Sequence, residues 1–122
     1  KKELDVGLDM YAYIAAKADA NSASQRELAY WRKHPNLHGW MQKLAESKNI
    51  KYSTFNGIEL ELTWEDLDEL ELAVTHGKLP ATSGFFFGND SDSEYQEQDL
   101  NFIKKAKAEL FLGLKVFYNS SW

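Results

Sequence analysis

Apolar and polar residues alternate along several segments of the chain, which is the pattern of half-buried β-strands. In the first of these segments, Met10, Ala12 and Ile14 alternate with Tyr11 and Tyr13. The four predicted strands are residues 8–16, 26–33, 55–62 and 114–120. A polar stretch of small residues separates the first two, so we expect them to form a hairpin across a long loop.

Apolar residues recur at helical spacing in three other segments. Pro35 suits the first position of a helix over residues 34–49, because its missing N–H would have no helical partner there. The apolar face of this helix comprises Leu37, Trp40, Met41 and Leu44.

The second predicted helix, over residues 63–78, has the clearest end signals in the chain. Thr63 is the expected N-cap, Gly77 is the expected C-cap, and acids in the first turn complement the helix dipole. Leu62 is placed to pack onto Leu67 across the helix start. The core-facing residues of this helix are Leu67, Leu70 and Val74.

The third predicted helix begins within residues 91–98 and ends at Gly113. Its core-facing residues are Leu100, Ile103 and Leu110. Because strands and helices do not alternate as βαβ units, the sequence predicts a single α+β domain over residues 1–122. We expect a small, mainly antiparallel sheet of about four strands, packed with three helices.

Composition narrows the chemistry that this chain can perform. The sequence has no cysteine, which excludes disulfides, thiolate nucleophiles and cysteine-bound zinc. No apolar run approaches the ~20 residues of a membrane span, and the start lacks the apolar stretch of a signal peptide, so we expect a soluble, intracellular protein that does not bind membranes. The net charge is −5, and residues 51–122 hold thirteen acids and six bases. Nucleic acid is therefore an unfavourable partner, since phosphate binding requires a basic surface.

The two histidines at positions 34 and 38 have the spacing of metal ligands on one helical face. Pro35 works against that interpretation, because the residue before a proline is displaced from the helical region. No HExxH motif accompanies them. We therefore predict a cap or surface role for His34 and a partly buried, hydrogen-bonded role for His38, with no metal site and no cofactor.

The acidic run after Gly88 has a superficial likeness to a calcium loop, because Asp90, Asp92 and Glu94 occur at alternate positions. Tyr95 stands where the loop requires glycine, and Asn101 stands where it requires a bidentate acid. These acids are therefore predicted to cap the third helix and complement its dipole.

Residues 30–33, "YWRK", combine two aromatic and two cationic side chains, a mixture that holds anionic ligands by stacking and charge. Alternation along a strand offers another interpretation, in which either Tyr30 or Trp31 is buried and the cations form surface ion pairs. Both interpretations are consistent with the sequence.

Three phenylalanines lie between two glycines in "SGFFFG", residues 83–88. Since burying a phenylalanine contributes about 2–3 kcal/mol, we expect Phe85 and Phe87 to be buried against the second and third helices. Phe86 would point the other way and line a shallow groove with Tyr30 or Trp31.

Five segments together resemble a family of small uncharacterised proteins encoded by tailed bacteriophages, marine ones included. The segments are "GLDMY" (7–11), "YWRKHPNLHGW" (30–40), "LPATSGFFFG" (79–88), "DLNFIKKA" (99–106) and "VFYNSSW" (116–122). The resemblance implies a phage accessory protein that acts in the cytoplasm of the host cell. It implies no reaction.

Two functional hypotheses from different classes follow. The first is an interaction module that binds a host or phage protein through an acidic face or an aromatic patch. The second is a small enzyme or ligand-binding domain with a pocket lined by Asp9, Tyr30, Arg32, His38 and Phe86. A homodimer is compatible with either, because two-fold dimers are the commonest soluble assemblies.

Overall fold

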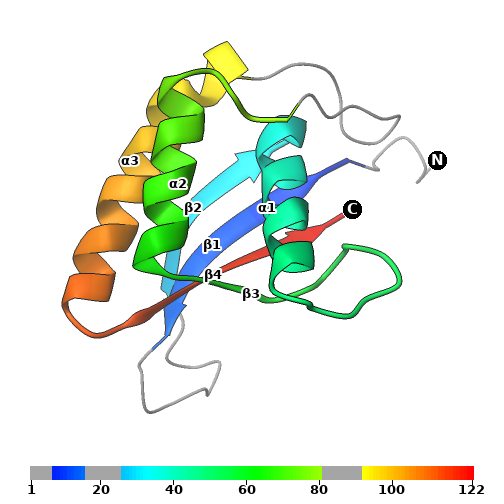
Figure 1. Cartoon of the computed structure of the whole chain (residues 1–122), viewed down its shortest axis with the longest axis horizontal. Coiled ribbons are helices and arrows are strands. Elements are labelled where there is room, and N and C mark those ends of the chain that lie inside the picture. Colours follow the sequence, from blue (N-terminus) through cyan, green and yellow to red (C-terminus); the bar gives the residue numbers. More distant parts are fainter. Residues whose placement is uncertain (1–6, 16–25, 81–91) are drawn as a thin grey trace.

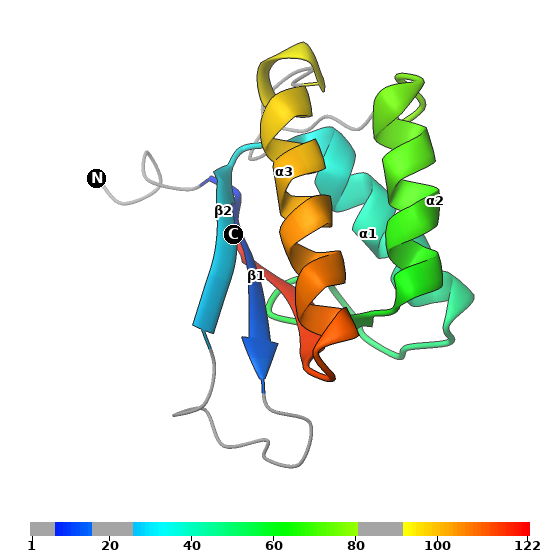
Figure 2. The same ribbon diagram turned by 90° about the vertical axis from the view of Figure 1, so that its left-hand side faces the viewer.

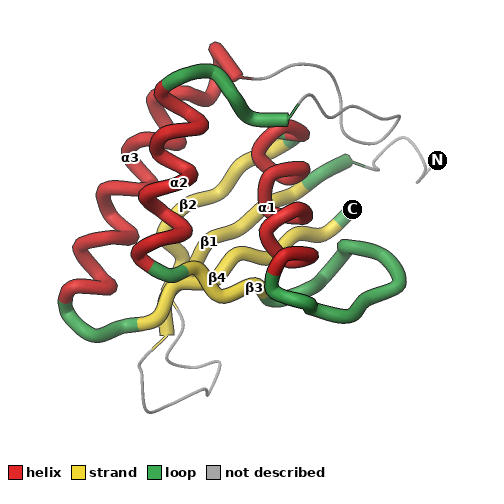
Figure 3. The backbone as a smooth tube through the Cα atoms, viewed as in Figure 1, coloured by secondary structure: helices red, strands yellow, loops and turns green. Residues whose placement is uncertain are grey.

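The computed structural model describes residues 7–15, 26–80 and 92–122, and Figures 1 and 3 show how these segments are arranged. The described residues form four strands and three helices. In chain order these are β1 (Asp9–Ala15), β2 (Arg26–Arg32), α1 (Pro35–Ser47), β3 (Leu60–Leu62), α2 (Trp64–Thr75), α3 (Asp92–Phe111) and β4 (Lys115–Ser121). The predicted α+β class is confirmed.

The four strands form one sheet in the order β2-β1-β4-β3, and each neighbouring pair is antiparallel. β1 and β2 form the predicted hairpin, with Tyr11 opposite Tyr30. Tyr11 is also opposite Asn119 of β4. Strands β2 and β3 are therefore the edges of the described sheet.

All three described helices lie on one side of the sheet, as Figure 2 shows. Strand alternation sends Met10, Ala12 and Ile14 to that side, where they join one buried hydrophobic cluster with Trp31 and Tyr118. The other side carries no helix among the described residues. We call it the open face.

Helix α2 begins as the sequence predicts. The Thr63 hydroxyl accepts a hydrogen bond from the N–H of Asp66 at 3.2 Å, and the Asp66 carboxylate accepts one from the N–H of Thr63 at 2.9 Å. This reciprocal capping box satisfies two N–H groups that the helix cannot. Gly77 follows the helix end with φ of 64°, the left-handed backbone for which glycine is preferred.

The structure corrects two predictions about these elements. The third strand comprises only Leu60–Leu62 instead of residues 55–62. On α3, Ile103 is buried as predicted, whereas Leu100 and Leu110 are only partly buried. The reason is the direction of the helix's inner face, which contains Asp99, Phe102, Ile103 and Ala106 and leaves the two leucines at its margin.

His34 is also not at the surface. It is fully buried, at the junction between β2 and α1. Lys33, with φ of 60°, turns the chain there, and its N–H donates to the carbonyl of Leu8 at 2.7 Å. The turn directs the next side chain, His34, inward.

None of the three helices in the described part of the chain has the length and apolar character that a bilayer crossing requires.

Candidate functional site

The open face carries a charged and aromatic cluster where β1 meets β2. The hydroxyl of Tyr30 donates to Oδ1 of Asp9 at 2.7 Å, and Nε of Arg32 lies 3.4 Å from the same oxygen. The ring of Tyr11 packs beside Tyr30, with 5.4 Å between ring centroids. The hydrogen bond to Asp9 raises the pKa of Tyr30, so its hydroxyl stays protonated and continues to donate.

A second aromatic pair lies further along the same face. Tyr13 of β1 stacks on Phe117 of β4 with 5.6 Å between centroids, and its hydroxyl donates to Glu59 at 2.5 Å. Partial burial, together with the nearby Glu59 carboxylate, raises the pKa of Tyr13. The open face thus presents two ring pairs, each with one hydroxyl held by a carboxylate.

A shallow groove of about 490 Å³ crosses the open face. Its walls come from β2, β1 and β4, and from the loop before β3. The lining residues include Tyr11, Tyr13, Glu27, Gly57, Asn119 and Ser121. Sequence reasoning missed this groove, although alternation in the first strand already placed Tyr11 and Tyr13 together, away from the core.

Gly7 explains part of the local geometry. A Cβ on Gly7 would lie 2.7 Å from Nη2 of Arg32 and 3.0 Å from Cε of Lys33. A residue without a side chain is therefore needed for the Arg32 guanidinium to lie where it contacts Asp9. This is a physical reason for the glycine at the start of "GLDMY".

The opposite side of the sheet holds a buried polar cluster. The indole N–H of Trp31 donates to Oδ1 of Asp99 at 2.9 Å, and Nε2 of His34 lies 2.8 Å from Oδ2 of the same carboxylate. The ring of Tyr95 stacks on His34 with 4.7 Å between centroids, and Phe102 packs edge-on against Trp31 at 5.1 Å. Trp31, His34 and Asp99 are each 1% exposed or less, so this cluster joins β2, the start of α1 and α3 within the core.

His38 belongs to the core on the same side. Its Nδ1 is hydrogen-bonded to the hydroxyl of Tyr118 at 2.7 Å, and Phe55 and Trp122 pack around its ring. Burial lowers the pKa of His38 to about 4, so the ring is neutral at physiological pH. The predicted hydrogen bond of His38 is present, but the residue is 1% exposed and so fully buried instead of partly buried.

The structure divides the residues predicted to line a pocket. Asp9, Tyr30 and Arg32 lie together on the open face, whereas His38 lies on the helix-covered side. The sheet separates the two groups, so Asp9, Arg32 and His38 cannot contact one substrate. Trp31 is completely buried and offers no surface for stacking.

The predictions for residues 83–88, including the outward Phe86, lie outside the described residues. Asp90, the first residue of the acidic run, also lies outside the described residues. Within the described ranges, no three histidine or acidic side chains are grouped closely enough to hold a metal ion.

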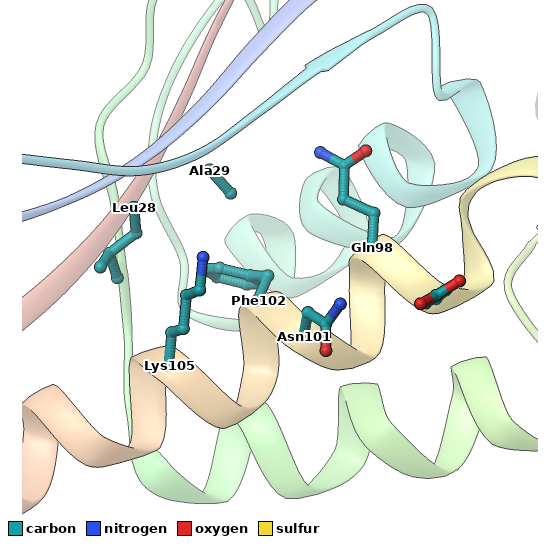
Figure 4. A pocket seen from close by; sticks show the side chains of 7 residues that line it. Leu28, Ala29, Gln98, Asn101, Phe102 and Lys105 are labelled. Carbon is teal, nitrogen blue, oxygen red and sulfur yellow. The ribbon is translucent and has the colours of Figure 1, made fainter.

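Another cavity, of about 370 Å³, lies between β2 and α3 (Figure 4). Gln98 and Lys105 extend from α3 toward β2, and Phe102 lies between them. Leu28 and Ala29 complete an apolar floor, while the polar lining comprises the amides of Gln98 and Asn101, the amine of Lys105 and the carboxylate of Glu97. Its described lining residues include no histidine, serine or threonine, so we assign no reaction to it.

Comparison with protein-family models, with curated proteins and with solved structures finds no match to this chain.

Proposed function

We propose that this chain is a protein-interaction module that binds its partner through the open face of the sheet. In keeping with the resemblance of its segments, we further propose that it is an accessory protein of tailed-phage type and that it acts in the host cytoplasm on a host or phage protein. The observation that carries the proposal is the concentration of aromatic rings on the open face. Tyr11, Tyr13, Tyr30 and Phe117 all lie there, and Tyr30 is 42% exposed.

Aromatic side chains favour this role because they bury large areas at a low cost in side-chain entropy. On the open face they already contact one another, at 5.4 Å and 5.6 Å between centroids. A partner would therefore meet a surface that is largely organised before binding, which lowers the cost of association.

The charges of the open face favour a basic partner. Its described acids are Asp9, Glu27, Glu59 and Glu61, and the described bases on its strands are Arg32 and Lys115. Lys33, in the turn after β2, lies beside the Arg32 guanidinium at the margin of this face. Both bases already lie near acids, Arg32 beside Asp9 and Lys115 at 3.9 Å from Glu61. An excess of acids repels phosphate, so the same aromatic surface is a poor platform for nucleic acid.

The edges of the sheet argue against a partner that binds by adding a strand. On β2, the hydroxyl of Tyr95 donates to the carbonyl of Arg32 at 2.5 Å, and Gln98 donates to the carbonyl of Tyr30 at 2.6 Å. On β3, Nζ of Lys48 donates to the carbonyl of Glu61 at 2.8 Å. These groups occupy the acceptors that an added strand would use, which leaves docking onto the face.

The alternative hypothesis, an enzyme or ligand-binding domain, loses support from the positions of its residues. It required acid, cation and imidazole to meet in one pocket, and a substrate on the open face cannot reach His38 through the sheet.

Affinity capture with a matched pair of aromatic variants tests the proposal. Tyr30 and Trp64 are both 42% exposed, but Trp64 begins α2 on the helix-covered side. The tagged protein is incubated with lysate from infected bacterial cells, and the bound proteins are identified by mass spectrometry. We expect Tyr30→Ala to lose a protein that both the wild type and Trp64→Ala retain.

Circular dichroism and thermal melts establish that both variants are folded. Equal recovery by Tyr30→Ala and the wild type would contradict docking on the open face. Loss with Trp64→Ala alone would move the binding surface to the helices.

A further inference from the structure

We infer that the groove across the open face accepts a cationic side chain, lysine or arginine, from the partner protein. This inference rests on the proposed function and specifies its chemistry. It is carried by the aromatic walls of the groove, by one groove-lining carboxylate, Glu27, with which no described base forms an ion pair, and by the size of the groove.

The walls supply the first requirement for binding a cation. Tyr11 and Tyr13 are two residues apart on β1 and therefore project from the same face, into the groove. The faces of aromatic rings attract ammonium and guanidinium groups, because the π-electrons make them electron-rich. Both rings are held in place by their ring partners, Tyr30 and Phe117.

Glu27 supplies the second requirement. It lies opposite Tyr13 in the β1–β2 register, lines the groove and is exposed. The other acids of the open face are engaged: Asp9 by Tyr30 and Arg32, Glu59 by Tyr13, and Glu61 by Lys115. Among the described residues, no base forms an ion pair with Glu27, so its carboxylate is available to an incoming cation.

Neutral acceptors and space complete the site. Asn119 and Ser121 place an amide and a hydroxyl on the same surface, where a guanidinium with five N–H donors finds further oxygen atoms. The groove volume of about 490 Å³ is within the range of ligand sites, which gives room for a side chain and for some of the backbone that carries it. An anionic side chain would instead meet the carboxylates of the same face.

Titration with charged and neutral amino-acid amides tests this inference. The probes are N-acetyl-arginine methylamide and N-acetyl-citrulline methylamide, which have nearly the same shape but differ by one positive charge. We follow the backbone amide signals of the ¹⁵N-labelled full chain by NMR. The arginine probe should shift the signals of Tyr11, Tyr13, Glu27 and Asn119 in a saturable manner, and the citrulline probe should not.

A matched pair of variants assigns the effect to one carboxylate. Glu27→Gln should weaken binding of the arginine probe by about fivefold, the factor that corresponds to one exposed ion pair of about 1 kcal/mol. Glu97→Gln removes an exposed acid on α3, away from the groove, and should leave binding unchanged.

Equal binding of the two probes, or equal affinity of Glu27→Gln and the wild type, would overturn the inference. Neither result would affect the proposed function, because the open face could still bind a neutral partner surface. Conversely, selective arginine binding together with unchanged affinity capture by Tyr30→Ala would uphold the groove chemistry and contradict the proposed function.

Discussion

The two faces of the sheet use similar residues in opposite ways, and adjacent residues of β2 show this directly. Trp31 is completely buried and donates to the buried carboxylate of Asp99, whereas Tyr30 is 42% exposed and donates to the solvated carboxylate of Asp9. Each hydrogen bond joins an aromatic donor to an aspartate. Only the surroundings differ.

That difference in surroundings determines how much each hydrogen-bonded pair stabilises the fold. Inside the core, removing one partner leaves the other desolvated and without its bond, which costs the full penalty of burying a polar group. On the open face, water replaces the lost partner, so the bond orients side chains but stabilises the fold little. Residues 30–32 therefore alternate between the two faces: Trp31 belongs to the core, whereas Tyr30 and Arg32 belong to the open face.

The largest expected effect is at Trp31. Trp31→Ala removes a large core side chain and a donor to Asp99, and should lower the free energy of unfolding by about 5 kcal/mol. Tyr30→Ala, one residue away, should lower it by about 1 kcal/mol or less. Urea denaturation of the two variants measures the contrast. Similar losses would contradict the assignment of the two residues to different faces.

Asp99→Ala should have the next largest effect. It removes the acceptor of Trp31 and the partner of His34, at 2.9 Å and 2.8 Å, and should cost about 3–4 kcal/mol. Asp68→Ala is the matched control, because the Asp68 side chain is 53% exposed and its contact with Lys107 lies at the surface. We expect the control to lose about 0.5 kcal/mol. If Asp99→Ala lowered the free energy of unfolding no more than the control does, the buried cluster would not stabilise the fold as we expect.

His38 makes the helix-covered side sensitive to acid. Its pKa is lowered to about 4 in the folded protein by burial, against an ordinary value of 6.5. Between these values the unfolded chain binds a proton that the folded chain does not, so stability is lost as the pH falls through this window. Lowering the pH from about 7.5 to about 5 should cost about 2 kcal/mol at this site.

Comparison of the wild type with His38→Gln isolates that contribution, because glutamine does not titrate while the other acids and histidines are shared. The free energy of unfolding, measured in urea at both pH values, should fall less in the variant. If the stability of both proteins fell equally with pH, His38 would not be the group that binds a proton on unfolding.

The smallest effect is expected on the open face, from Gly7→Ala. The added Cβ would displace the Arg32 guanidinium from Asp9, and because that end of the side chain is free to move, the stability loss should stay below about 1 kcal/mol. The NMR signal of the Arg32 side-chain N–H should shift, while the bond from Tyr30 to Asp9 persists. An unchanged Arg32 signal would show that the glycine is not needed for this contact.

Much of the fold is predictable because its signals are local. Thr63 and Gly77 mark the ends of α2 through caps that depend only on nearby residues, and strand alternation places Met10 and Tyr11 on opposite faces before any partner is known. Such signals do not give the strand order β2-β1-β4-β3, which depends on contacts between residues far apart in the sequence.

The buried cluster was missed for a different reason. The third helix contains many charged residues, and nothing distinguishes Asp99 from its neighbours by composition. Its position on the helix does distinguish it. Asp99 falls within an apolar stripe at helical spacing, formed by Tyr95, Phe102 and Ala106. An ionisable residue at such a position requires a buried partner, and His34 and Trp31 are too distant in the sequence to be recognised as that partner.

The side chains that cover the β2 edge come from α3, which is synthesised long after β2. Tyr95 and Gln98 are 63 and 68 residues away from the β2 carbonyls that they satisfy. During synthesis the hairpin of β1 and β2 emerges first, with its outer edge uncapped until α3 has been made and has docked. Uncapped strand edges are templates for aggregation. The β2 edge is therefore most open to aggregation during synthesis, before α3 has docked. Once docked, α3 protects that edge through Tyr95 and Gln98.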